Sequence, residues 1–296
     1  MKHKTTGQKV FTVFNTIIIS ILTIICVIPI WTMFCYSISN SAAVSSGLVT
    51  FWPVNVTQAA YKMVMENSKF WHSFAITGKR ILLGLPFTML MIILAAYPLS
   101  KSETIFKARK YYVWIFVFTM LFSGGLIPTY VLISKMGLID SIWALVLPGA
   151  VPVFNVVLMM NFFKSIPGEI EEAALIDGAN QWTVLWRIIL PLSVPSLATV
   201  TLFVLLSHWN SWFDGLIYMN RPENYPLQSY LQTIIVDSTQ LMMQSGNIED
   251  LILKMQVSNE NMRAAQIFIS MIPVMCVYPF LQRYFTTGIV MGSVKG

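Results

Sequence analysis

Long apolar runs restrict the possible folds of this chain more than any other feature. The 296 residues are 56% hydrophobic and only 11% charged, whereas soluble domains carry about 25% charged residues. An apolar run of about 20 residues crosses the hydrocarbon core of a bilayer as a helix, because all its backbone hydrogen bonds are internal. The sequence therefore predicts an all-α, polytopic membrane protein with one membrane domain and no separate soluble catalytic domain.

Six segments are apolar enough to be transmembrane helices, and polar stretches separate them. These predicted spans are 11–36, 73–99, 111–134, 141–163, 195–219 and 262–282.

The spans define the predicted domain organisation. Residues 1–10 and 283–296 are terminal tails, and residues 11–282 form the transmembrane domain, with a polar loop at 164–194 between spans four and five. No small-residue cleavage site follows the first apolar run, so we expect it to be retained as a span.

The distribution of charge predicts the orientation. With both termini on the inner side, eleven Lys and Arg residues lie inside and eight lie outside, and the short basic loop from Lys101 to Lys110 is internal. Positively charged short loops stay in the cytoplasm. We therefore expect both termini and the 164–194 loop to be cytoplasmic, and the net charge of +6 to reflect topology rather than nucleic-acid binding.

Glycine and proline interrupt spans three and four. The interrupting residues are Gly124, Gly125, Pro128, Pro148, Gly149 and Pro152. Broken helices are tolerated in a membrane where protein or a water-filled cavity covers the freed backbone groups. The breaks therefore indicate either a translocation path or hinge, or close packing of small residues between helices.

The 164–194 loop has the pattern of helix, turn, helix. Pro167 and Gly168 mark a turn, and three glutamates follow in the first helical turn, where negative charge suits a helix N-terminus. Gly178 ends this helix at a bend, and a second helical run from Trp182 stops at Pro191.

This loop resembles the signature loop of ABC importer permeases, which reads Glu-Ala-Ala, three residues, Gly, nine residues, Ile-x-Leu-Pro. The matching residues are Glu172, Ala173, Ala174, Gly178, Ile188, Leu190 and Pro191. The resemblance implies coupling helices that dock on an ATP-hydrolysing subunit, and the alternative is an ordinary amphipathic loop helix. The coupling residues that it implies are Glu171, Glu172, Ala173, Ala174, Asp177 and Gly178.

Three further segments resemble carbohydrate-uptake permeases. They are 95–101 (Ala-Ala-Tyr-Pro-Leu-Ser-Lys), 209–214 (Trp-Asn-Ser-Trp-Phe-Asp) and 288–296, the last being similar to the Gly-rich tail of the second permease of the maltose transporter. The resemblance implies sugar or oligosaccharide import across the bacterial cytoplasmic membrane by alternating access. It also implies that the tail reaches the ATPase subunits, through Gly288, Gly292, Ser293 and Lys295.

The partners follow from the same resemblance. They are a second homologous permease, two ATP-binding subunits, an extracytoplasmic solute-binding protein and the lipid bilayer. The sequence contains no Walker motif, so we expect ATP and Mg²⁺ to be bound by the partner ATPase and this chain to hydrolyse nothing. Cys26, Cys35 and Cys276 lack metal-ligand spacing, and we expect no cofactor, metal site or catalytic residue in this chain.

Polar and aromatic residues within the spans are candidates for the substrate path. Asn210, Trp212 and Asp214 suit a sugar, which offers apolar faces to aromatic rings and hydroxyl edges to polar groups. The alternative is an interfacial aromatic belt with a structural Asn. Lys79 and Arg80 either extend to the outer interface or face the path, where they would attract an acidic sugar.

Three other functions are compatible with parts of the pattern. One is an ABC permease for another small solute, such as an amino acid, phosphate or a metal ion, because the signature loop fits those permeases too. The second is an integral membrane transferase, and the third is a passive channel. His208, a lone histidine beside tryptophans, is expected to have a hydrogen-bonded structural role.

Overall fold

The computed structural model describes residues 5–244 and 260–293, and for 236–244 and 280–293 it describes only the backbone. All regular elements in these ranges are helices, as the sequence predicts. The chain divides into two compact units, one from residues 1–70 and 233–272 and the other from residues 71–232 and 273–296.

The first unit is built on a long N-terminal helix. Its helices are α1 (Thr6–Ile38), α2 (Ser41–Ser45) and α3 (Ala59–Glu66). The apolar side chains of α1 are exposed along most of its length, as expected of a helix that faces lipid. Its C-terminal end is anchored, because Ser37 Oγ and Tyr61 Oη are 2.8 Å apart and Cys35 is buried against Ala43 and Val44.

The second unit contains most of the helices. They are α4 (Ser68–Ser100, with its first three residues in the other unit), α5 (Arg109–Leu121), α6 (Leu126–Lys135), α7 (Ile142–Val146), α8 (Val153–Ser165), α9 (Gly168–Ile176), α10 (Gln181–Val184), the π-helix η1 (Leu185–Ile189), α11 (Leu190–Leu192), α12 (Val194–Asn210), α13 (Phe213–Tyr218) and the 3-10 helix η2 (Pro222–Asn224). Two more helices, α14 (Leu227–Gln244) and α16 (Glu260–Ser293), have residues in both units.

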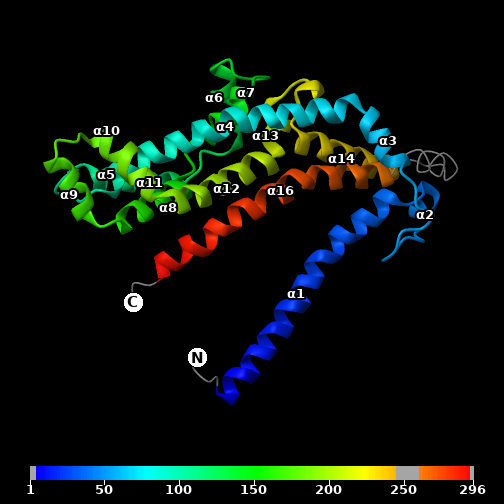
Figure 1. Ribbon diagram of the computed structural model, residues 1–296. Coiled ribbons are helices and arrows are strands. Elements are labelled where there is room, and N and C mark those ends of the chain that lie inside the picture. The colour runs from blue at the N-terminus through cyan, green and yellow to red at the C-terminus, as the bar shows by residue number, and fades with distance from the viewer. Residues whose placement is uncertain (1–4, 245–259, 294–296) are drawn as a thin grey trace. The chain divides into compact units, whose positions relative to one another are not determined.

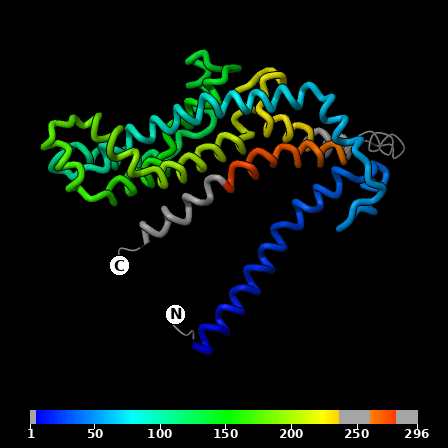
Figure 2. Tube along the Cα trace, in the orientation of Figure 1, coloured from blue at the N-terminus to red at the C-terminus, as the bar shows by residue number. Residues whose placement is uncertain are grey.

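Helix α4 is the central element of the second unit (Figure 1). Its apolar residues, among them Ile92 and Ala96, form the core with Met159 of α8 and Val200 of α12. Figure 2 shows α4 as one continuous cyan helix, although it contains two prolines. Helices α5, α9 and α10 lie around its C-terminal end, and α7 and α13 lie beside its first half.

The predicted spans correspond to single long helices, to bent pairs of helices, or to a shorter apolar helix. Three helices are long and apolar enough to cross a membrane by themselves, namely α1, α4 and α16 as far as Pro279. Two bent pairs each qualify when taken together: α5 with α6, bent by 113°, and residues 181–192 with α12, bent by 84°. Helix α8 has 13 residues, so the described chain gives up to five spans by length and composition, and the predicted count of six is not confirmed.

The helices break close to where glycine and proline predict breaks. Helix α5 ends at Leu121 and α6 begins after Gly125. The φ of Gly125 is 90°, a backbone conformation that favours glycine. Irregular backbone between α7 and α8 includes Pro148, Gly149 and Pro152. A third break, at Ser211 and Trp212 between α12 and α13, was not predicted.

Two segments are more helical than the sequence predicts. The connector between spans five and six contains the 18-residue helix α14. Helix α16 continues past residue 282 through Gly288 and Gly292 to Ser293, where we expected a tail. Lys295 lies outside the described residues.

Candidate functional site

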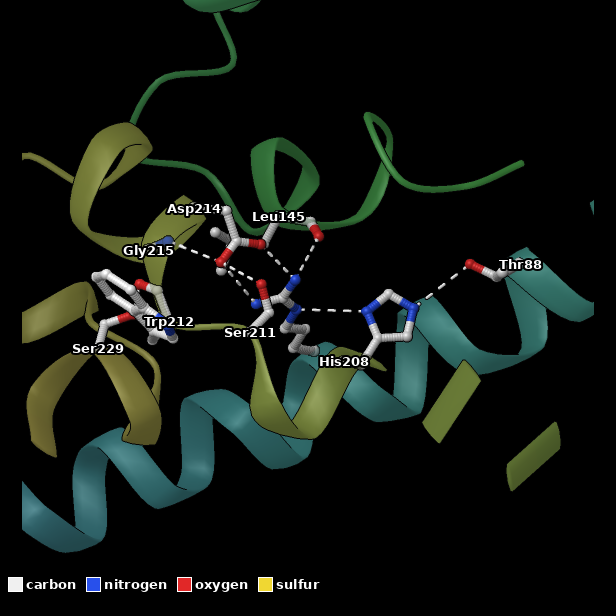
Figure 3. Close-up of polar contacts among 9 residues, drawn as sticks. Thr88, Leu145, His208, Ser211, Trp212, Asp214, Gly215 and Ser229 are labelled. Atoms are coloured by element: carbon white, nitrogen blue, oxygen red, sulfur yellow. Dashed lines mark hydrogen bonds and ion pairs between the residues drawn. The ribbon is translucent and has the colours of Figure 1, made fainter. Parts of the chain in front are cut away.

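Arg80, on the first half of α4, is a buried cation whose partners are Asp214, Leu145 and His208; Figure 3 labels these three partners. Its side chain is 4% exposed and forms an ion pair with Asp214 of α13, in which Nη1 donates to Oδ1 at 3.2 Å. Nη2 donates to the carbonyl oxygen of Leu145 in α7 at 3.1 Å, and Nε donates to Nδ1 of His208 in α12 at 3.4 Å. One guanidinium therefore connects α4 to three other helices, which its planar set of five N–H donors permits.

His208 continues this network along α4. Because its Nδ1 accepts from Arg80, its Nε2 carries the proton and can donate to Thr88 Oγ1, 3.4 Å away. The imidazole lies against Gly84, where an added Cβ would come within 2.8 Å of His208 Cε1. The expected structural role of this histidine agrees with this packing, since the side chain is buried and bonded at both nitrogens.

The break between α12 and α13 is held by its own hydrogen bonds. Asp214 Oδ1 accepts from Ser211 Oγ at 2.7 Å and from the backbone nitrogen of Gly215 at 2.9 Å. Ser229 Oγ donates to the carbonyl oxygen of Trp212 at 2.6 Å. Two backbone groups at the break, the Trp212 carbonyl and the Gly215 amide, are therefore hydrogen-bonded to side chains, as a membrane interior requires.

A cavity of about 160 Å³ lies beside the cluster. Its polar lining includes Thr88, Asn155, Ser207 and His208, besides the ion pair. Lining residues from α7 and from the break before α8 lie beside those from α12 and α13, so the interruptions of two predicted spans meet at this cavity.

The structure sorts the predicted substrate-path residues into two groups. Arg80 and Asp214 are brought together in the cavity wall, whereas Asn210 and Trp212 are exposed and do not line it. Of the two positions expected for Arg80, extension to the outer interface does not fit its side chain, which is buried and paired. Lys79, the preceding residue on the helix, is exposed.

A second ion pair lies at the C-terminal end of α4. Lys101 Nζ pairs with Glu171 of α9, and the two side chains are 11% and 16% exposed. The same Nζ lies 3.9 Å from the ring centroid of Tyr97. Tyr97 Oη donates to Gln181 Oε1 of α10 at 2.7 Å and lies 3.5 Å from Glu171 Oε1. Sequence reasoning named Glu171 but did not predict these partners, because they are about 70 residues away.

The helix-turn-helix predicted for the 164–194 loop is present as α9 and α10. Gly178 has a φ of 85° in the turn between them, as the bend predicts, and Asn180 Oδ1 caps α10 by accepting from the nitrogen of Thr183 at 2.8 Å. The second helical run passes through Pro191 and ends at Leu192, so the predicted stop is one residue early.

The loop exposes part of its signature. Glu172, Ala173 and Asp177 are exposed, whereas Ala174 is half-buried against the core. Ile176 is 86% exposed and lies beside these residues on the loop.

A second cavity, of about 300 Å³, lies next to the Lys101–Glu171 pair. Both members of the pair line it together with Lys164 and Glu172.

Within the residues that the structure describes, no group of three or more His, Cys, Asp or Glu side chains is arranged to hold a metal ion. The chemistry of both clusters is that of paired charges and hydrogen bonds, which position helices.

Apolar helices broken at a polar cavity, together with a helix-turn-helix beside the end of α4, are typical of an α-helical membrane protein that moves a solute. No model of a protein family matches the sequence. Individual relatives do match. The polygalacturonan/rhamnogalacturonan transport system permease protein YtcP of Bacillus subtilis (strain 168) is 34% identical over 92% of this chain and 94% of its own length. The galactooligosaccharides transport system permease protein GanQ of the same organism is 27% identical over 96% of this chain and 95% of its own length.

A solved structure is similar as well. It is a chain from the crystal structure of a bacterial ABC transporter involved in the import of the acidic polysaccharide alginate. The two chains share 35% sequence identity with a TM-score of 0.83, over 96% of this chain and 100% of the other. This protein therefore belongs to the ABC transporter permeases of carbohydrate-transport systems.

Proposed function

We propose that this chain is the membrane-spanning permease subunit of an ATP-driven importer that takes up an oligosaccharide. The observation that carries the proposal is the match to YtcP over 92% of the chain. The fold supports it, because broken helices around a polar cavity suit a path that opens to alternate sides of a membrane.

The proposed topology has six spans with both termini in the cytoplasm. Helices α7 and α8 together form span four, and α9 and α10 follow it on the cytoplasmic side. The excess of Lys and Arg in the short loop at 101–110 supports this orientation.

The proposed assembly contains a second homologous permease, two ATP-binding subunits and an extracytoplasmic binding protein. The exposed residues of α9, Glu172 and Ala173 among them, would meet the ATP-binding subunit. ATP and Mg²⁺ would be bound there and not by this chain. The C-terminal residues, from Gly288 onward, would also reach that subunit, so deleting Gly288–Gly296 should lower transport while leaving membrane insertion intact.

Uronate-containing oligosaccharides are the first substrates to test. The names of YtcP and of the alginate transporter refer to acidic polysaccharides. Arg80 would not bind such a substrate by itself, because Asp214 already neutralises its charge. Lys79, the preceding residue on the same helix, is exposed and has no counter-charge among the ion pairs of the described residues.

The test is uptake by the complex reconstituted in liposomes with its binding protein. We expect ATP-dependent uptake of oligogalacturonides, and the neutral control is a galacto-oligosaccharide of the same length. Uptake of the neutral sugar alone would reject the acidic substrate, and uptake of amino acids or phosphate without sugars would reject the carbohydrate assignment. Flux that needs no ATP would instead identify a passive channel.

A further inference from the structure

We propose that Lys101 and Tyr97 are positioning residues that fix the 164–194 loop to the end of α4, so that movement of the loop is delivered to α4. Glu171 and Glu172 then have different tasks: Glu171 binds α4 within this chain, and Glu172 faces the ATP-binding partner. The inference rests on the proposed function, because it needs a partner that moves the loop.

The contacts at the end of α4 join both helices of the loop to one point. Lys101 pairs with Glu171 of α9, and Tyr97 donates to Gln181 of α10 at 2.7 Å. Lys101, the residue after α4, has its Nζ 3.9 Å from the ring centroid of Tyr97 on α4, so the two side chains also support each other. The pair is mostly shielded from water, with 11% and 16% of its side chains exposed. Such a pair is weakly screened by salt and holds its geometry better than a surface pair.

Helix α9 has few other attachments to the rest of the chain. None of its residues is buried, and Ala174 is half-buried against the core. The Lys101–Glu171 pair holds the first turn of α9, and Ala174 lies almost one turn further on. Because α9 contributes so little buried apolar area, the ion pair determines how rigidly α9 follows α4.

The neighbouring glutamate lines the same cavity of about 300 Å³ but has no such pair in the part of the chain that the structure describes. Glu172 is exposed, and within the described residues its carboxylate forms no ion pair. A free carboxylate on an exposed helix is available to a partner, whereas Glu171 is occupied.

Helix α4 connects this point to the polar cluster at Arg80. Lys101 and Arg80 are 21 positions apart, which is about 31 Å along a helix. The helix is continuous from Arg80 to Ser100, the residue before Lys101, and at the far end Arg80 contacts α7, α12 and α13. A displacement of α9 that is transmitted by the Lys101–Glu171 pair would therefore reach the breaks around the 160 Å³ cavity.

The experiment separates assembly from coupling in the reconstituted complex. Variants of this chain are Lys101→Glu, Glu171→Lys and the double variant that exchanges the two charges. Measurements are retention of the ATP-binding subunit on an affinity column, the ATPase rate, and the number of substrate molecules transported per ATP. We expect both single variants to retain the ATPase subunit and to lower transport per ATP at least about fivefold, which is the range of allosteric coupling. The exchanged pair should recover most of the loss.

Three controls make the result specific. Lys101→Arg keeps the pair and should behave like the unmodified chain. Glu103→Lys disrupts an exposed pair, Arg109–Glu103 at 3.9 Å with Glu103 63% exposed, and should leave transport per ATP unchanged. Glu172→Lys should weaken retention of the ATPase subunit instead of the coupling ratio.

Milder variants keep the inference testable if charge reversal prevents folding. Lys101→Gln and Tyr97→Phe remove one charge or one hydroxyl, and each should lower transport per ATP in a complex that still assembles. Unchanged transport per ATP in both of these variants, or in charge-reversal variants that fold, would overturn the inference. So would a double variant with exchanged charges that does not recover transport per ATP. If Glu172→Lys weakens retention in that case, the proposed function stands without the inference. If the unmodified chain retains no ATPase subunit, both are wrong.

Discussion

The guanidinium of Arg80 and the carboxylate of Asp214 form a two-point ion pair between residues that are 134 positions apart in the sequence. The pair joins α4 to the short helix that follows the break in the fifth predicted span. Since Leu145 of α7 accepts from the same guanidinium, the broken ends of two spans are attached to one residue of α4. These breaks are therefore held in place around the cavity, which favours a fixed cavity wall over a free hinge.

Removing one partner of this pair should be costly. Asp214→Asn leaves the charge of Arg80 buried without a counter-charge, and such a loss costs about 3–5 kcal/mol of stability. The midpoint of thermal unfolding of the purified complex should fall accordingly. The double variant Arg80→Met, Asp214→Asn should lose less stability than the two single variants lose in sum, because no unpaired charge remains.

The matched control is the exposed pair of Glu103 and Arg109. Glu103→Gln should change stability by less than about 1 kcal/mol, as is usual for surface pairs. Equal losses for Asp214→Asn and Glu103→Gln would show that the Arg80–Asp214 pair is not buried in the assembled protein.

Gly84 should be intolerant of a side chain. A Cβ at this position would lie 2.8 Å from Cε1 and 2.9 Å from Nε2 of His208, so Gly84→Ala must displace the imidazole from Arg80 and Thr88. Gly78→Ala, on the same helix, meets nothing within 4 Å and should gain up to about 1 kcal/mol from the higher helix propensity of alanine. Thermal unfolding of the two variants distinguishes them, and equal midpoints would contradict the packing of His208 on α4.

The sequence predicted the helical class, the positions of most spans and the helix-turn-helix around Gly178, because these depend on local composition and spacing. The break at Ser211 was missed, since it contains neither proline nor glycine and is stabilised by Asp214 and Ser229. The 18-residue α14 was also missed, because its mixed polar composition resembles that of a connector.

The partners of charged residues could not be predicted. Arg80 in an apolar run is compatible with either an interfacial or an internal position, and only the fold brings Asp214 next to it. Glu171 and Glu172 are adjacent and chemically identical, yet the helical rotation of about 100° between them turns one toward Lys101 and leaves the other exposed.

Cysteine labelling should establish the orientation. The native Cys26, Cys35 and Cys276 are first replaced, because two of them are exposed. A cysteine at Ser46 should then react with an impermeant maleimide in intact cells, and a cysteine at Ser102 only after permeabilisation. Both positions are exposed, so failure to react reports the side of the membrane and not burial.

Asn247 offers a second outer position for labelling, although it lies outside the described residues. Reaction of the Ser102 cysteine in intact cells would reverse the proposed topology and place the 164–194 loop outside.

The turn at Gly178 should tolerate only residues that adopt a left-handed backbone. Its φ is 85°, and an added Cβ would meet nothing within 4 Å, so the cost of a substitution comes from the backbone and not from a clash. Gly178→Val should cost about 1–2 kcal/mol, which lowers the population of the bent loop by about 5–30-fold. Asparagine visits this conformation more readily, so the ATPase rate of Gly178→Asn should stay close to that of the unmodified protein.

The control is Gly168→Ala, which adds a Cβ in the same loop at a position without a positive φ. The measurement is the substrate-stimulated ATPase rate of the reconstituted complex, which should fall for valine alone. An unchanged rate for Gly178→Val, with the ATPase subunit retained, would mean that the bend takes no part in coupling.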